Sequence, residues 1–233
     1  MKRMLLTLTL LLTLVTAAQA QEAWRALTVT GSGSAGGAPD MALVRLGVQT
    51  SDEDVLAAFD RSNQVTADII EALLALGIER ADIQTSGLSL HQDRPYDPYS
   101  DVEDGTIIYW AQNTLSVTLR DVTLVGQALG VSVQAGANSI DRLSYGISDP
   151  AELEARAREL AVADARARAE HLAELTGAQL GRVFNISESD GGFRVRAESL
   201  VFAAMTADAG GAATVEAGQL SVSVQLQITW ELQ

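Results

Sequence analysis

Residues 149–177 of this 233-residue chain read DPAELEARARELAVADARARAEHLAELTG, and this segment determines what its neighbours can pack against. Asp149 and Pro150 are typical of a helix start, because an acidic cap and a proline in the first turn both suit a helix N-terminus. Gly177 is typical of the left-handed residue that ends a helix. Because alanine has a short side chain, a ridge of alanines predicts a long helix whose axis lies close to its neighbour. The apolar residues that recur every four positions are Leu153, Ala157, Ala161, Ala165, Ala169 and Ala173.

The arginines of this helix are interleaved with carboxylates. Arg158, Arg166 and Arg168 each have an acidic residue four positions away. Such spacing favours ion pairs along a helix, so we expect a solvated, ion-paired face rather than an anion-binding site.

The last segment of the chain has the period of a strand. Residues 220–232 read LSVSVQLQITWEL, in which apolar and polar residues alternate at every position. This alternation predicts a strand with one buried face and one face that is wet or covered by a partner. Further strands are expected at 27–30, 42–48, 83–92, 106–120, 139–147, 180–188 and 193–205, with a turn at 190–192.

Two further helices are expected before the alanine-rich one. The first is expected to begin at Ser51, whose hydroxyl can cap free backbone amides with Asp54 three residues later, and to end at Gly77. The second is expected to begin after Asp121 and to end near Gly136. Helices mixed with long two-faced strands predict an α+β fold, a mostly antiparallel sheet packed with about three helices.

A glycine-rich segment, GSGSAGG at 31–37, separates the first two expected strands. It contains the spacing G-x-G-x-x-G, which binds dinucleotides when a helix follows. Here Pro39 and an alternating strand follow instead, which argues against nucleotide binding. We therefore expect a flexible turn between two strands, in which glycine permits unusual dihedrals.

The first twenty residues have the pattern of a cleavable signal peptide. A cationic start at 2–3 precedes an apolar stretch at 5–15, and the small residues of a signal-peptidase site lie at 18–20. The apolar stretch is shorter than the ~20 residues of a membrane-spanning helix. We therefore expect export with cleavage before Gln21 and a single mature domain at 21–233. The expected location is the periplasm, with peripheral association with the outer membrane left open.

Composition excludes several chemistries. The chain has 16 Lys and Arg against 30 Asp and Glu, a formal net charge of −14, and its only lysine, Lys2, lies in the expected leader. Such an acidic chain repels phosphate backbones, so nucleic-acid binding is not expected. Without lysine the mature chain cannot form a Schiff base. Without cysteine it has no thiol nucleophile, disulfide or thiolate metal site.

No group of residues predicts a catalytic, cofactor or metal site. His91 and His171 lack metal-ligand spacing, and no serine lies in a nucleophile elbow. The acidic loop at 93–105 departs from the EF-hand order, because Val102 occupies a ligand position. The loop can instead be a contact loop, since tyrosine is enriched in recognition surfaces. Its candidate contact residues are Tyr96, Asp97, Tyr99 and Asp101.

Five segments occur in the order in which one bacterial family has them. They are VTGSG at 29–33 with PDMA at 39–42, residues 72–85, GANSI at 136–140, the alanine-rich helix with GAQLGRV at 177–183, and EAG at 216–218. Together they resemble the SIMPL-domain family, formerly a domain of unknown function, which includes the YggE-like and periplasmic immunogenic proteins. The last segment lacks the proline that is common before its glycine. The resemblance implies an α+β fold, an exported protein, and no established catalytic residues or cofactor.

The resemblance also guides the functional hypotheses, since some members form ring-like assemblies and others are linked to protection against oxidative and envelope stress. Our leading hypothesis is a non-enzymatic exported protein that self-assembles as a homo-oligomer and supports stress tolerance. Exposed strand edges agree with it, because a partner subunit can cover them. One alternative is a periplasmic binding module that presents the 93–105 loop to a ligand or an envelope protein. Another is an unrecognised hydrolase that uses His91 or His171.

Overall fold

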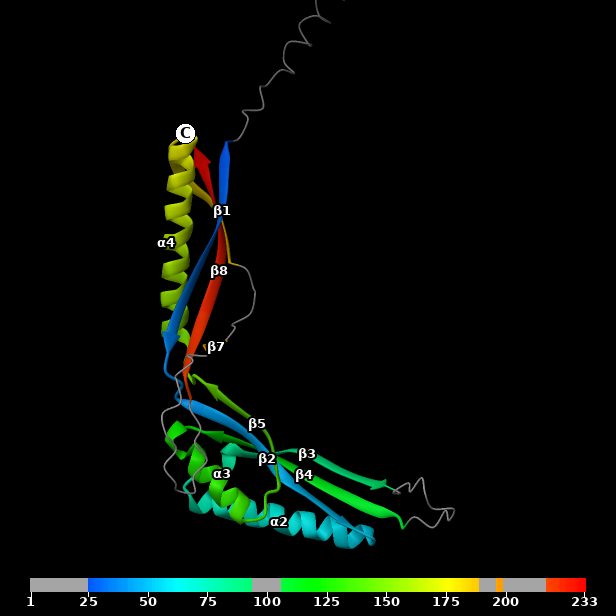
Figure 1. Ribbon diagram of the computed structural model, residues 1–233. Helices are drawn as coiled ribbons and strands as arrows, with labels where there is room; N and C mark the ends of the chain where they lie inside the picture. The colour runs from blue at the N-terminus through cyan, green and yellow to red at the C-terminus, as the bar shows by residue number, and fades with distance from the viewer. Residues whose placement is uncertain (1–24, 94–105, 189–195, 199–216) are drawn as a thin grey trace, which may run out of the picture.

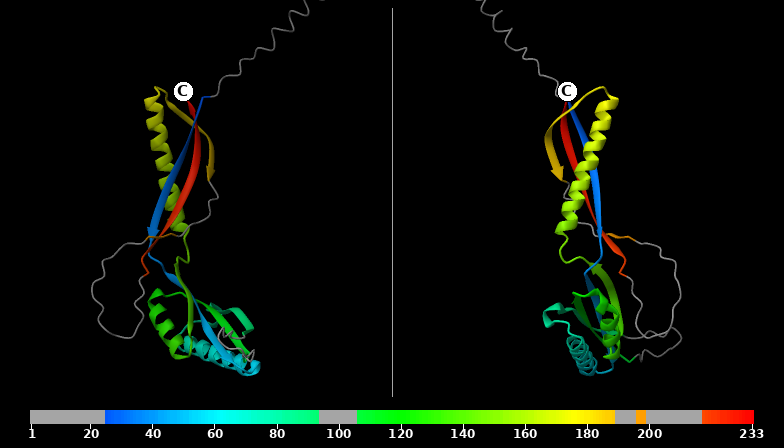
Figure 2. Two further views of the ribbon diagram at one scale, coloured as in Figure 1. Left: turned by 45° about the vertical axis from the view of Figure 1, so that its right-hand side comes forward. Right: turned by 90° about the vertical axis from the view of Figure 1, so that its left-hand side faces the viewer.

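The computed structural model describes residues 25–93, 106–188, 196–198 and 217–233. In these residues it contains two antiparallel four-stranded sheets, each packed against helices, which confirms the predicted α+β class. We call the two halves the α4 layer and the α2 layer. They lie at opposite ends of the molecule in every view (Figures 1 and 2).

The α4 layer is built from both ends of the described chain. Its sheet has the order β1-β8-β6, and β7 pairs with the beginning of β8. Figure 1 shows α4 lying along this sheet. Its elements are β1 (Ala26–Gly37), α4 (Ala151–Leu175), β6 (Leu180–Glu188), β7 (Arg196–Glu198) and β8 (Gln219–Leu232).

The α2 layer is inserted between β1 and α4. Its sheet has the order β3-β4-β2-β5, and α2 and α3 pack on one face of it. Most predicted strands of both layers are found within a few residues of their expected bounds. The elements of this layer are β2 (Met41–Asp52), α2 (Val55–Ala75), β3 (Ile83–Asp93), β4 (Ile108–Leu119), α3 (Val125–Gln134) and β5 (Ser139–Gly146), with short 3-10 helices η2 (Arg80–Asp82) and η3 (Val122–Leu124).

Some expectations fall outside the described residues. These are the leader at 1–20, the turn at 190–192 and most of the strand at 193–205, of which Arg196–Glu198 is described as β7.

The alanine ridge of α4 packs closely on its neighbour, as the sequence predicts, and the structure identifies that neighbour as β1. The five alanines of the ridge, from Ala157 to Ala173, are all buried. A Cβ added to Gly31 would lie 2.6 Å from the Cβ of Ala165, and one added to Gly33 would lie 2.5 Å from the backbone nitrogen of Ala161. The helix therefore approaches so closely that only glycine fits on the strand beneath it.

The prediction of a flexible turn at 31–37 was wrong. These residues form the second half of β1, and they pair in continuous register with β8 from Gly31 opposite Leu226 to Gly37 opposite Leu220. Gly31 and Gly33 provide space for α4. None of the glycines at 31–37 has a positive φ. The segment is followed by β2 and not by a helix, so it lacks the geometry of a dinucleotide site.

The core of the α2 layer lies between its sheet and its two helices. Alternate residues of β2 and β4 face α2, and Val44 opposite Val117 and Leu46 opposite Leu115 are each 1% exposed. The intervening residues face away from both helices. The α2 side chains buried on this core include Ile69 and Leu73.

The first helix begins later than expected. Ser51 belongs to β2, where it pairs with Trp110, so it cannot cap the helix. The cap is Asp54, whose carboxylate accepts a hydrogen bond from the Leu56 amide at 2.8 Å. Asp121 plays the same role for η3 by accepting from the Thr123 amide at 2.9 Å.

All three expected glycine helix ends are confirmed. Gly77, Gly136 and Gly177 have φ values of 94°, 107° and 70°. At each end, the glycine and the residue after it donate hydrogen bonds back to the last helical turn, as in Ile78 to the Leu73 carbonyl at 3.1 Å. This is the Schellman arrangement, and it satisfies carbonyls that the helix leaves unpaired.

In the described part of the chain, the backbone passes between the layers after β1 and after β5, and Asp40 connects these two crossings. Its amide donates to the Gly146 carbonyl at 3.1 Å. Its carboxylate accepts from the Ser148 amide at 2.7 Å and from the Ser148 hydroxyl at 2.6 Å. These two hydrogen bonds from Ser148 hold the pKa of the Asp40 carboxyl below its usual value.

Gly33→Ala should destabilise the protein by about 1–3 kcal/mol, because the new methyl group would overlap the backbone of α4. Gly36→Ala is the matched control in the same strand, since its Cβ would meet nothing closer than the Leu220 carbonyl at 3.8 Å. Urea unfolding of both variants checks this. Equal midpoints for the two variants would contradict the close packing of α4 on β1.

Asp40→Asn should lower the free energy of unfolding at neutral pH by more than it does in acid. The folded chain lowers the Asp40 pKa, so the contribution of its carboxylate is complete above about pH 4 and is lost as pH falls through the lowered pKa. Urea unfolding of the wild type and the variant at neutral pH and at about pH 3 measures the loss in free energy of unfolding at each pH. Glu71→Gln on α2 is the control for removal of a carboxylate. A difference of the same size at both pH values would count against the prediction.

Candidate functional site

The predicted contact loop lies almost wholly outside the described residues. Tyr96, Asp97, Tyr99 and Asp101 fall in 94–105, and only Asp93 is described, at the end of β3 opposite Ile108. The role of the loop therefore stays a prediction.

The structure does not bring the two histidines together. His91 is exposed on β3 opposite Trp110, whereas His171 is exposed on α4 in the other layer. Within the described ranges, no three His, Cys, Asp or Glu side chains are grouped so that they can hold a metal ion. The geometry gives no support to a site built on both histidines.

The arginines of α4 form the ion pairs expected from the sequence. Arg158 pairs with Glu154, Arg166 with Glu170, and Arg168 with Asp164, at 2.9–3.1 Å. Asp164 also accepts from the Ser32 amide at 2.9 Å, and this bond is the main reason that the pKa of Asp164 is lowered. The bond ties α4 to β1, the strand at the opposite edge of the sheet from β6.

The strongest candidate site is the exposed edge of the α4 layer at β6. Strand β6 ends the order β1-β8-β6, so one side of its backbone has no neighbouring strand among the described residues. Its apolar side chains are exposed: Val183 by 48%, Phe184 by 56% and Ile186 by 57%. We call these three residues, together with Val162 of α4, the β6 edge surface.

The register explains why these side chains are exposed. Val183 pairs with Trp230 and Ile186 with Ile228, and both partners are buried beneath α4. Val183 and Ile186 therefore face the same side of the sheet as the helix. However, α4 lies mainly over β1 and β8 and leaves the edge strand uncovered. The register of β6 shifts on both sides of Val183, which breaks the alternation that would reveal its faces in the sequence.

A hollow on α4 continues this surface. Val162 is 42% exposed and lies one turn after Arg158, on the side of the helix that faces β6. The hollow is open to solvent and is lined by Arg158, Glu159, Val162, Ala163 and Arg166.

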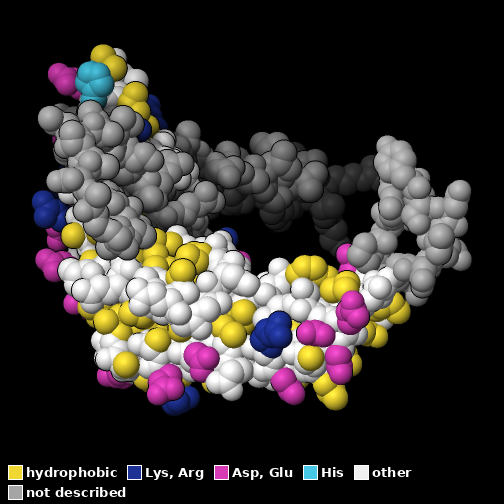
Figure 3. Space-filling model, turned by 60° about the horizontal axis from the view of Figure 1, so that its bottom comes forward, with side chains coloured by type: hydrophobic (Ala, Val, Ile, Leu, Met, Phe, Trp, Pro, Cys, Tyr) yellow, Lys and Arg dark blue, Asp and Glu magenta, His cyan; other side chains and the backbone are white. Residues whose placement is uncertain are grey.

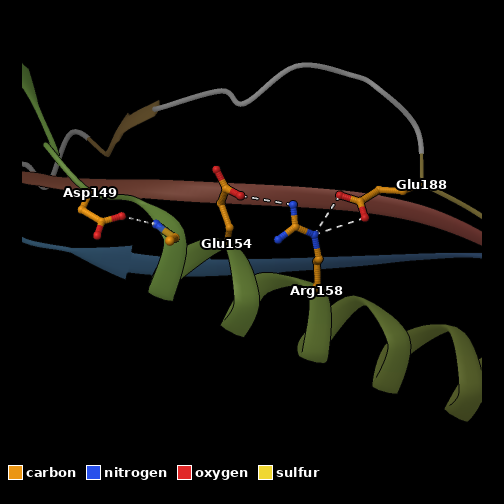
Figure 4. Close-up of polar contacts among 5 residues, drawn as sticks. Asp149, Glu154, Arg158 and Glu188 are labelled. Carbon is orange, nitrogen blue, oxygen red and sulfur yellow. Dashed lines mark hydrogen bonds and ion pairs between the residues drawn. The ribbon is translucent and has the colours of Figure 1, made fainter.

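Charged groups border the surface at one end. Figure 4 shows Arg158 between two carboxylates, one from its own helix and one from β6. Its Nε donates to the two carboxylate oxygens of Glu188 at 3.0 and 3.2 Å, and a terminal nitrogen donates to Glu154 at 3.1 Å. Glu188, followed by Glu154, raises the pKa of Arg158, so this guanidinium stays cationic. The group holds one cation between two carboxylates at the border of the surface, and the centre of the surface is apolar.

The α2 layer also has exposed edges. Strand β3 ends its sheet, and Leu88 and Leu90 are 58% and 48% exposed. At the other edge, Ile140 of β5 is 50% exposed. Unpaired strand edges with apolar side chains are ready to pair with another strand. This arrangement can bind a polypeptide.

None of the helices described by the structure is both long enough and apolar enough to cross a lipid bilayer.

Comparison with known proteins identifies the family. The model of the SIMPL family, a protein of unknown function (DUF541), matches residues 27–230. The chain is 34% identical over 164 residues to the 26 kDa periplasmic immunogenic protein of Brucella melitensis, covering 70% of this chain and 66% of that protein. It is 29% identical over 190 residues to the uncharacterized protein YggE of Edwardsiella ictaluri, covering 82% and 78%.

The aligned part thus spans just under two thirds of the Brucella protein. YggE of Escherichia coli K12 is 27% identical over 160 residues, which cover 69% of this chain and 64% of that protein. The match of the family model spans both layers and nearly all of the described residues. The chain therefore belongs to the SIMPL family.

Proposed function

We propose that this chain is an exported, non-enzymatic periplasmic protein that self-assembles through its β6 edge surface and supports tolerance of envelope and oxidative stress. The observation that carries the assembly is the position of β6 at the end of its sheet among the described strands, together with three exposed apolar side chains on it. The periplasmic location is supported by the leader pattern at 1–20 and by relatives that are named periplasmic. The stress component is supported by the family resemblance.

Assembly through β6 would remove two unfavourable features together. A strand from a second copy would extend the sheet at β6, which ends the order β1-β8-β6 among the described strands. The same copy would cover Val183, Phe184 and Ile186, and burial of apolar area is the main driving force for association. Arg158 is already paired with Glu154 and Glu188, so its guanidinium keeps its ion pairs when the border is buried.

The net charge of −14 opposes this assembly at long range. Screening by salt shortens the repulsion to about 8 Å at physiological ionic strength. Assembly through an apolar edge should therefore strengthen as salt is added, whereas assembly through ion pairs should weaken.

Ile186→Lys should convert an assembled wild-type protein to a lower mass, because a charged edge residue disfavours strand pairing. The matched control is Leu56→Lys, which makes the same charge change at a leucine of α2 that is 66% exposed and lies on no strand edge. Light scattering across a series of protein and salt concentrations measures the mass. A monomeric wild type throughout, or an Ile186→Lys variant with the wild-type mass, would contradict the proposal.

The physiological component has its own test. A strain that lacks the gene should lose viability under peroxide or envelope stress, and the wild-type chain should restore it better than Ile186→Lys does. Equal survival of the deletion strain and its parent would reject the stress role. The proposal of self-assembly would not be affected by that result.

A further inference from the structure

The face of the α2-layer sheet that points away from α2 carries two arginines side by side. Arg45 of β2 pairs directly with Arg142 of β5, and both side chains are exposed. Side chains directly opposite each other on neighbouring strands lie about 5 Å apart at Cβ, so like charges there repel each other. No other register pair between described strands joins two arginines.

Neither arginine is neutralised by the rest of the described chain. Five other arginines, in contrast, form ion pairs. Asp141 is next to Arg142 in the sequence, but its carboxylate accepts a hydrogen bond from the Ser139 hydroxyl at 2.5 Å and pairs with neither arginine. Two adjacent uncompensated cations are unexpected in a chain of net charge −14, unless an anionic group binds them.

The arginines belong to a row of side chains that crosses the whole sheet. The register gives Arg142 opposite Arg45, Arg45 opposite Ser116, and Ser116 opposite Gln84. The rows beside it also present hydroxyl and amide groups. The polar residues of this face that are exposed or partly exposed include Gln84, Ser89, Gln112, Ser116, Thr118 and Ser144.

The far end of the face carries two ring side chains, Trp110 opposite His91. The face thus carries the two arginines, hydrogen-bonding groups along it and rings toward the far end, where Asp93 at the end of β3 adds one carboxylate. The opposite side of this layer is different, because α2 exposes Asp60, Asp68 and Glu71 there. Figure 3 shows that side, with acidic side chains spread across it.

We propose that this sheet face binds a carboxylate-bearing glycan, with Arg45 and Arg142 holding a carboxylate and the neighbouring polar side chains binding sugar hydroxyls. The planar guanidinium group binds a carboxylate through two parallel hydrogen bonds, and two adjacent guanidinium groups can hold one carboxylate from both sides. The hydroxyl and amide side chains both donate and accept hydrogen bonds, as sugar hydroxyls do.

The same features disfavour other anionic partners. Protein interfaces have an apolar core, but the branched aliphatic side chains at the register positions of this face, Leu43 and Ile108 among the described strands, lie far apart. Leu43 is opposite Thr118 near the end of β4, whereas Ile108 begins β4. A nucleic acid is bound by neutralising many phosphates, and two arginines in an acidic chain cannot do so. The site lies in the other layer from the β6 edge surface, so the proposal does not depend on self-assembly.

Titration calorimetry of the purified protein with oligogalacturonate, a glycan with a carboxylate on every sugar, tests the proposal. Arg45→Gln and Arg142→Gln should each weaken binding by roughly tenfold or more, the effect of one lost charge-assisted hydrogen bond. Arg61→Gln is the matched control, because it removes the same charge from the exposed face of α2. It should change affinity by less than about twofold. Circular dichroism checks that each variant is folded.

Two further ligands separate the contributions of charge and sugar. Dextran carries the hydroxyls without the carboxylates, and polyglutamate carries the carboxylates without the sugar. Both should bind at least about tenfold more weakly than oligogalacturonate. The proposal is overturned if oligogalacturonate does not bind, if the two arginine variants bind it as the wild type does, or if polyglutamate binds equally well, which would point to an acidic protein instead.

Discussion

The close packing of α4 on β1 is the interaction on which the rest of the structure depends. The alanines of the helix and the glycines of the strand are complementary, since each side lacks the atoms that would hold the other away. This contact fixes α4 over β1 and β8. The helix then lies toward the β1 edge of the sheet and does not cover β6 at the other edge. The edge that we propose for assembly is therefore a consequence of the same packing that holds the layer together. The chain is acidic and has no disulfide, so apolar packing of this kind must supply most of its stability.

The two layers divide the chain in a way that affects function. The α2 layer is an insertion between β1 and α4, and it is joined to the α4 layer at two chain crossings that Asp40 connects. Each layer has its own core, so each can expose a different surface without disturbing the other. In the α4 layer that surface is apolar and lies at a strand edge. In the α2 layer it is the polar sheet face with Arg45 and Arg142. One chain can thus carry an assembly surface and a ligand-binding surface that act independently.

Much of the fold could be predicted from periodicity, because the alanine ridge, the alternation of β8 and the three glycine helix ends are local signals. The role of Gly31 and Gly33 could not, since glycine suits both a turn and a close approach, and only the position of α4 decides between them. Ser51 and Asp54 are both good caps, and pairing of Ser51 with Trp110 in the sheet selects the second. The candidate surfaces depend on which strand lies at an edge and on register. Neither Val183 with Ile186 nor Arg45 with Arg142 is recognisable as a pair before the strands are aligned.

The central claim is that β6 is the strand that a second copy covers. Hydrogen exchange of the backbone amides, compared between dilute and concentrated protein at physiological salt, tests it most directly, because it reports on individual segments. The account predicts that exchange in residues 183–188 slows as the mass of the protein rises, while exchange in β1, whose Ser32 amide is already bonded to Asp164, stays the same. A rise in mass with unchanged exchange in β6 would show that the copies meet elsewhere and would contradict the account.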